Sequence, residues 1–159
     1  MKNILVPTDF TVDSLVLLKK AIENEDEKLN LILAYGKPLP SSISELVFFS
    51  RSKILDSLES PSFKEAKGIL ENRYFSRVNS LRTDIFFGKN QNAFDNFLKG
   101  NKIDKAYIPN DPKSLHPRLK KGFDLTPFLK KADLELIEIT YSNRTPMTVE
   151  ETLAKLLIP

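Results

Sequence analysis

Two short, almost wholly apolar segments near the start of the chain, residues 2–7 and 29–35, constrain the fold more than any other feature. The first stops at Pro7, and a short apolar run that ends at a proline is typical of a buried strand. Thr11 then predicts the start of a helix, because its hydroxyl can accept a hydrogen bond from an unpaired amide of the first turn. Helical spacing of apolar residues continues to about Glu25. Two buried strands joined by one helix indicate a parallel sheet covered on both faces.

The remainder of the chain continues this alternation of strands and helices. Two S-x-x-E patterns, which begin at Ser42 and Ser62, predict helix starts where side chains exchange hydrogen bonds with free amides. Thr126-Pro127 predicts another start, with proline at the first helical position. The other predicted elements are helices over residues 43–58, 63–78 and 148–157, a short helix from Asn90 to Gly100, and strands over residues 82–87, 105–108 and 134–141.

This order of elements predicts a doubly wound α/β domain, with a five-stranded, mostly parallel sheet and helices on both faces. Right-handed crossovers leave few other arrangements. We assign residues 1–141 to this domain and residues 142–159 to a C-terminal helical extension, packed on the same domain or on a dimer partner. A chain of 159 residues can bury such a core without disulfides.

The composition excludes several kinds of chemistry. The chain has no cysteine, which excludes disulfides, thiolate metal sites and cysteine nucleophiles. Its single histidine, His116, has no spaced carboxylates to complete a metal site and no nucleophile elbow beside it. We therefore expect no metal, no catalytic residues and no enzyme activity. The net charge of +3 does not suggest nucleic acid, and no apolar stretch approaches the roughly 18 residues of a membrane span, so a cytoplasmic protein is expected.

Any ligand site should lie at one edge of the predicted sheet. Ligands of doubly wound folds bind beyond the carboxyl ends of the strands. In this chain that edge comprises residues 7–10, 35–37, 88–90 and the loop that begins at Pro109. A function that depends on a pocket is expected there.

Three segments, taken in order, resemble the universal stress protein family over about residues 1–141. Residues 4–11, ILVPTDFT, resemble the opening of that family, with an aspartate after the first strand and a hydroxyl residue that caps the helix. Gly88 resembles the glycine that ends its third strand, and residues 103–108 resemble the start of its fourth strand. The resemblance implies the adenine nucleotide alpha hydrolase-like fold and, in many members, an ATP site.

The glycine motif of ATP-binding members is replaced in this chain. That motif is Gly, two residues, Gly, nine residues, Gly, then Ser or Thr. With Gly122 as the third glycine, the first two fall on Pro109 and Pro112, and Phe123 falls on the hydroxyl position. Proline has no amide hydrogen and a φ fixed near about −65°, so it cannot cradle a phosphate as glycine does. We therefore predict no ATP cofactor.

A residual cleft is the remaining candidate site. Asp9, which faces the nucleoside in the family, either holds a ribose or another polyol, or binds loop amides and caps the first helix. The basic side chains of the loop after Pro109 either bind an anion or only keep the surface soluble. The candidate residues are Thr8, Asp9, Tyr35, Gly88, Pro109, Asn110, Pro112, Arg118, Lys120, Lys121, Gly122 and Phe123.

Partners are expected to be proteins. An open sheet edge at residues 134–141 is an association hazard that a homodimer or the C-terminal helix would cover. Three functions follow. The leading one is a non-catalytic, stress-response or regulatory module that acts through contacts with an unidentified protein partner. The alternative is a sensor of a small molecule (a nucleoside, an AMP-like compound or another anion), and the weakest is an ATP-hydrolysing or phosphotransfer enzyme.

Overall fold

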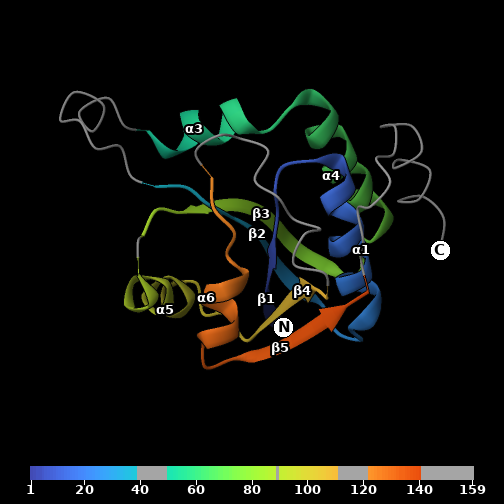
Figure 1. The fold of residues 1–159 in the computed structure, drawn as a ribbon. Coiled ribbons are helices and arrows are strands. Elements are labelled where there is room, and N and C mark those ends of the chain that lie inside the picture. Colours follow the sequence, from blue (N-terminus) through green and yellow to red (C-terminus); the bar gives the residue numbers. More distant parts are fainter. Residues whose placement is uncertain (39–49, 89, 111–121, 141–159) are drawn as a thin grey trace.

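The computed structural model describes residues 1–38, 50–88, 90–110 and 122–140, and within them five parallel strands form one sheet (Figure 1). The order β3-β2-β1-β4-β5 places the first strand in the centre, and the pairs on both sides of it are parallel. This is the predicted doubly wound arrangement. The strands are β1 Lys2–Pro7, β2 Leu29–Gly36, β3 Val78–Phe86, β4 Lys105–Pro109 and β5 Glu135–Ile139.

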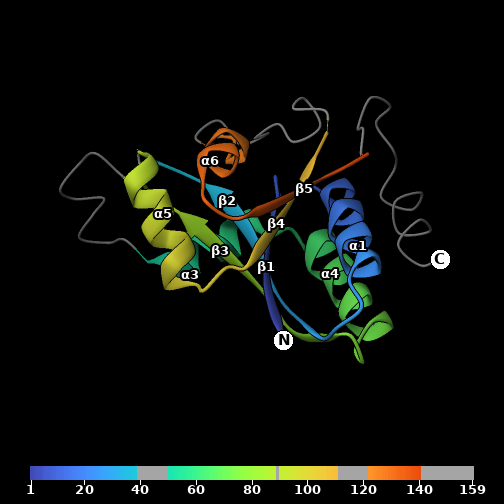
Figure 2. The ribbon, with the colours of Figure 1, turned by 90° about the horizontal axis from the view of Figure 1, so that it is seen from below.

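Helices cover both faces of this sheet, as Figure 2 shows in the view from below. One face carries a 3₁₀ turn, Val12–Ser14, with α1 Leu15–Asn24, α3 Arg51–Leu58 and α4 Pro61–Arg73. The other face carries α5 Gln91–Gly100 and α6 Thr126–Lys131. Each layer encloses an apolar cluster against the sheet, so the central strand is buried from both sides.

The first βα unit forms as its sequence predicts. β1 spans the predicted residues, and its last four are buried. Thr11 caps the 3₁₀ turn, because its Oγ1 accepts a hydrogen bond from the Ser14 amide at 3.2 Å. α1 continues from this turn to Asn24, close to the predicted end. Asn90 caps α5 at the predicted start of that helix, and its Oδ1 accepts from the Ala93 amide at 2.9 Å.

The insert between β2 and β3 departs from the prediction at its helix starts. α3 begins at Arg51, because Ser50 has extended backbone and its side chain accepts from the Lys53 amide, so no single helix covers residues 43–58. Ser42 and residues 43–49 lie outside the described residues. α4 is capped by Ser60 and not by Ser62. Pro61 favours this earlier start, because a first-turn residue needs no amide partner.

The boundary between α4 and β3 also lies earlier than predicted. The helix ends at Arg73 and the strand begins at Val78, whereas the sequence suggested a helix to residue 78 and a strand from residue 82. The first half of β3 is polar and partly exposed, so it lacks the apolar run that marks a buried strand. This half of β3 is held as a strand by its hydrogen-bonded pairing with β2, which the sequence pattern does not reveal.

The other elements agree with the prediction within a few residues. β4 and β5 cover the centres of their predicted segments, and α6 begins at Thr126 with Pro127 in its first turn. The predicted helix over residues 148–157 lies outside the described residues. In the described part of the chain, no helix has the length and apolar character needed to cross a lipid bilayer.

Candidate functional site

The carboxyl ends of β1 and β2 meet at a small cavity. It is closed on one side by residues 123–125, which follow the loop after β4. Its volume is about 10 Å³, which is room for about one water molecule. The described residues that line it are Pro7, Thr8, Asp9, Ala34, Tyr35, Gly36, Phe123, Asp124 and Leu125.

Asp9 and Thr8 hold the turn between β1 and the first helix. The Asp9 Oδ1 atom accepts hydrogen bonds from the Thr11 amide, at 3.0 Å, and from the Thr11 hydroxyl. The Thr8 Oγ1 atom accepts from the Phe10 amide at 3.1 Å. These bonds stabilise Phe10, whose φ of 61° lies in the left-handed region. The contacts of Asp9 therefore agree with the second of its two predicted roles, which is to bind the loop.

Phe123 occupies the space above the end of β2. Its amide donates to the Gly36 carbonyl oxygen at 2.9 Å, and the two residues form an isolated antiparallel bridge. A Cβ atom on Gly36 would lie 2.6 Å from the Phe123 ring and 2.7 Å from its carbonyl oxygen, so only glycine permits this approach. The ring packs edge-on against Phe86, with centroids 6.1 Å apart. The space beyond the end of β2 is therefore filled by an apolar side chain.

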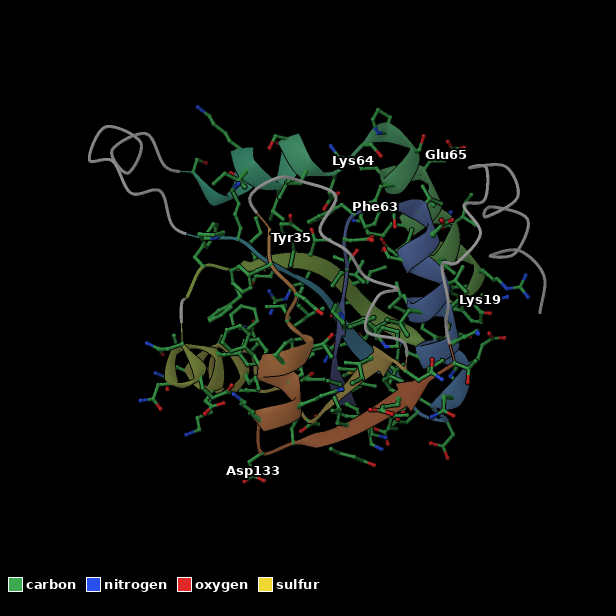
Figure 3. The ribbon with its side chains drawn as sticks, viewed as in Figure 1. Lys19, Tyr35, Phe63, Lys64, Glu65 and Asp133 are labelled. Atoms are coloured by element: carbon green, nitrogen blue, oxygen red, sulfur yellow. The ribbon has the colours of Figure 1, made fainter. Side chains whose placement is uncertain are left out.

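Tyr35 contributes a buried hydroxyl without a hydrogen-bond partner among the described residues. The residue is 2% exposed and lies at the end of β2 (Figure 3). Its ring packs edge-on against Phe10 at a centroid distance of 5.0 Å. Burial, together with the negative charge of Asp9, raises the pKa of the Tyr35 hydroxyl above its usual range. The neutral hydroxyl remains both a donor and an acceptor, and an unpaired buried group of this kind costs roughly 1–3 kcal/mol.

The remaining sequence-predicted site residues are distributed over the other strand ends. Gly88 follows β3, and a Cβ there would lie 2.3 Å from the Phe86 ring, so packing explains this glycine. Pro109 ends β4, and the Asn110 amide donates to the Ile139 carbonyl oxygen at 2.9 Å. Gly122 directly precedes Phe123. Pro112, Arg118, Lys120 and Lys121 lie outside the described residues.

The structure therefore brings together Thr8, Asp9, Tyr35 and Phe123 and places Gly88 and Pro109 at the same edge of the sheet. No group of three or more histidine, aspartate or glutamate side chains converges as a metal site within residues 1–38, 50–88, 90–110 and 122–140. The described residues of the cleft supply one carboxylate that holds its own loop, one orphan hydroxyl and an apolar wall. This set can bind one polar group.

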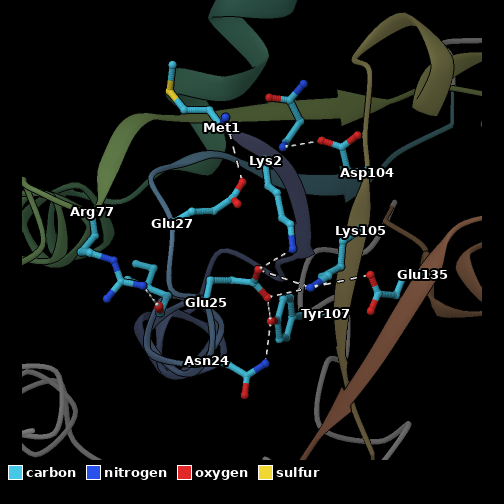
Figure 4. A network of polar contacts seen from close by, with 12 residues as sticks. Met1, Lys2, Asn24, Glu25, Glu27, Arg77, Asp104, Lys105, Tyr107 and Glu135 are labelled. Carbon is cyan, nitrogen blue, oxygen red and sulfur yellow. Dashed lines mark hydrogen bonds and ion pairs between the residues drawn. The ribbon is translucent and has the colours of Figure 1, made fainter.

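A buried ionic network near the end of α1 was not predicted from the sequence (Figure 4). The Lys105 Nζ atom lies 3.0 Å from the Glu25 Oε2 atom, and the Tyr107 hydroxyl donates to the same carboxylate. Asn24 donates to the Tyr107 oxygen at 2.8 Å, and Lys2 lies 3.5 Å from Glu25. Glu25 and Lys105 stand 80 residues apart in the sequence, so no local pattern predicts that they pair. The sequence shows only a charged residue at a helix end and another at a strand start.

Burial and pairing together set the protonation of this network. Burial disfavours the charged carboxylate, but hydrogen bonds from Tyr107 and Lys105 outweigh it and lower the pKa of Glu25. Burial opposes the charge of Lys105 in the same way, and its bond to Glu25 raises its pKa. Burial and the bond to Glu25 raise the pKa of Tyr107 to about 12. The ion pair is therefore charged at neutral pH, with a neutral tyrosine beside it.

Comparison with known proteins locates the fold among solved structures. No family model matches the chain, and no curated protein sequence matches it. A universal stress protein, UspA from Lactobacillus plantarum, matches with 18% identity and a TM-score of 0.55, over 87% of this chain and 97% of that one. The hypothetical protein MJ0577 matches with 16% identity and a TM-score of 0.51, over 89% of this chain and 97% of that one. The chain therefore has the doubly wound fold of a universal stress protein, as its sequence resemblance implied.

Proposed function

We propose that the chain is a divergent universal stress protein, a non-catalytic regulatory or stress-response module of the cytoplasm that acts through protein contacts and does not bind ATP. The observation that supports this function best is the bridge between Gly36 and Phe123. It fills the strand ends with an aromatic ring and leaves about 10 Å³ between the described residues. A nucleotide needs far more space than a single water molecule.

The residues after β4 support the same proposal. A phosphate cradle depends on backbone amides that point at the anion. Pro109, at the end of β4, offers no amide hydrogen, and Phe123 offers no hydroxyl. Each charge-assisted hydrogen bond that is lost weakens binding by roughly 1.5–3 kcal/mol. Two or three such losses reduce affinity by orders of magnitude.

Thermal unfolding with ATP, ADP, AMP and adenosine, each with magnesium, tests this proposal. A ligand at 100 times its dissociation constant adds about 2.7 kcal/mol, which raises the midpoint by roughly 5–10 °C for a domain of this size. We expect no rise with ATP or ADP at millimolar concentration. The matched control is Phe123→Ser, which restores the hydroxyl of the motif but keeps Pro109. A clear rise with ATP in the unchanged chain would refute the proposal.

We also propose that the module forms a homodimer. β5 is an edge strand of the sheet, and its apolar residues Leu136, Ile137 and Ile139 are only partly buried. An edge of this kind is usually paired, covered or charged. Light scattering is expected to report the mass of two chains at micromolar concentration. The mass of one chain across the concentration range would rule the homodimer out.

A second function, the sensing of a small molecule, is favoured by the orphan hydroxyl of Tyr35. A buried polar atom without a partner is satisfied by a ligand group or a water. A nucleoside, an AMP-like compound or another anion would place a polar group between Tyr35 and Asp9 after Phe123 moves. A thermal shift with adenosine or AMP alone would support it, provided that Tyr35→Phe abolishes the shift. Equal shifts in both chains would assign the binding to another site.

A further inference from the structure

A groove lies at the amino ends of β4 and β5, at the opposite end of the sheet from the cleft. Its volume is about 260 Å³, several times the roughly 30 Å³ of one water molecule. Its floor is apolar and consists of Leu98, Ile103 and Leu134. Figure 3 shows Asp133 at the turn between α6 and β5, far from Tyr35. The groove therefore lies away from the cleft, and it shares no lining residue with the ionic network.

Charged side chains of both signs surround the apolar floor. Lys99 and Lys102 stand on one rim, where α5 ends, and Asp133 stands on the other. These three side chains are exposed and form no ion pair within the described part of the chain. Asp95 is already bound, because its Oδ1 atom accepts from Gln91 at 3.0 Å. The groove suits an amphipathic segment that carries an acidic residue beside its apolar side.

Residues 148–157 of this chain, TVEETLAKLL, have that character. With helical spacing, Val149, Leu153, Leu156 and Leu157 share one side. Glu150 flanks this side, while Lys155 lies on the opposite, polar side. We propose that this segment docks as a helix in the groove of its own chain, with its leucines on the apolar floor and Glu150 beside Lys99 or Lys102.

The chain is long enough to make this connection. β5 begins beside the groove and ends near α1, where Lys20 donates to the Thr140 carbonyl oxygen at 2.6 Å (Figure 1). Thr140 lies six residues after Leu134, which is a distance of about 20 Å along an extended strand. Eight residue steps separate Thr140 from Thr148, and an extended chain of that length reaches about 26 Å. The connecting residues are therefore long enough to span the distance from Thr140 back to the groove and deliver the helix there.

A spin label on the tail tests the docking in the full chain. Because the protein has no cysteine, Glu151→Cys, on the polar side of the segment, gives a single site for a nitroxide label and keeps Glu150. We expect the label to cause a loss of amide signal intensity at Leu98, Ile103 and Leu134, and none at Ala66 and Leu70 of α4 on the other face. Strong loss on α4 with intact groove signals would overturn the proposal, as would equal and weak effects everywhere.

Two further measurements separate docking from its alternatives. In a mixture of isotope-labelled chains without the nitroxide and unlabelled chains that carry it, the groove signals should keep their intensity. Loss of signal in that mixture would assign the tail to a second copy and overturn the intramolecular proposal. In the spin-labelled chain, Leu153→Asp with Leu156→Asp should restore the groove signals. The matched control, Lys155→Gln on the polar side, should leave the loss unchanged, and recovery in both variants would contradict an apolar contact.

Discussion

Removal of one partner from the Glu25–Lys105 pair should destabilise the fold strongly. Both side chains are nearly buried, with 3% of Glu25 and 8% of Lys105 exposed, and their closest atoms are 3.0 Å apart. A single substitution leaves the other charge without its main partner in a poorly solvated place. Loss of one member of a buried pair typically costs about 3–5 kcal/mol.

The geometry places both single variants at the lower end of this range. After Glu25→Gln, Lys105 keeps a second carboxylate, Glu135, at 3.7 Å, and that side chain is largely exposed. After Lys105→Met, Glu25 keeps Lys2 at 3.5 Å and the hydrogen bond from Tyr107. Because a partner remains in each case, we expect costs near 3 kcal/mol and not near 5. For a chain of this length, that lowers the unfolding midpoint by roughly 6–12 °C.

Urea and thermal unfolding, followed by circular dichroism at pH 7, would measure these changes in a double-mutant cycle. The double variant Glu25→Gln with Lys105→Met removes both charges, so its cost should be well below the sum of the two single costs. The exposed pair Lys64–Asp56, at 3.7 Å, is the matched control and should contribute at most about 1 kcal/mol. Single variants as stable as the unchanged chain, or costs that simply add, would refute the assignment of a coupled buried pair.

Three other predictions concern the pH dependence of this network, the cap of α4 and the close approach at Gly36. The low pKa of Glu25 stabilises the fold above the ordinary value of 4.5, and this stabilisation is lost as the pH falls through the folded pKa. The raised pKa of Tyr107 stabilises the fold below pH 10, and this stabilisation is lost towards about pH 12. Urea unfolding across pH should show both losses of stability, with the acid loss absent in Glu25→Gln and the alkaline loss reduced in Tyr107→Phe. Ser60→Ala should cost about 0.5–2 kcal/mol in urea unfolding, while Ser62→Ala should change stability by less than about 0.5 kcal/mol, and the reverse order would return the cap to Ser62. Gly36→Ala should lower the free energy of unfolding, measured by calorimetry, by about 1–3 kcal/mol, because the new methyl group meets the Phe123 ring at 2.6 Å. This loss should be smaller in a Phe123→Ala background, and an equal loss there would show that the ring does not contact Gly36.

Elements with a distinct local sequence pattern could be predicted from the sequence, and elements that form through tertiary pairing could not. β1 was predicted to the residue, because its apolar run ends at Pro7 and no other element competes for it. The start of β3 was placed four residues too late, because its exposed half is polar and becomes a strand only through pairing with β2. Ser60 and Ser62 are both suitable helix caps, and Pro61 decides between them. Proline is tolerated in the first turn of a helix, so the helix can begin at Pro61 with Ser60 as its cap.

The candidate site was predictable in its location but not in its contacts. The fold rule placed Asp9, Tyr35 and Phe123 at one edge of the sheet, and the structure gathers them there. The sequence left the role of Asp9 open, because the choice depends on whether the Thr11 amide is within reach. Neither the bridge between Gly36 and Phe123 nor the pair of Glu25 with Lys105 leaves a periodic pattern, because each joins segments more than 75 residues apart.

The sheet of this fold and the loop after β4 depend on different residues, so the sheet does not require a phosphate-binding loop. The sheet rests on the apolar strands around β1 and on the two clusters that cover them. A cradle rests on amides and small side chains in the loop after β4, which add little to the core. Phe123 packs against Phe86 and Phe128 at that position, so an aromatic side chain there favours packing. Packing therefore gives a physical reason for the closed cleft, in which the Tyr35 hydroxyl is the one buried side-chain polar atom without a partner among the described cleft residues.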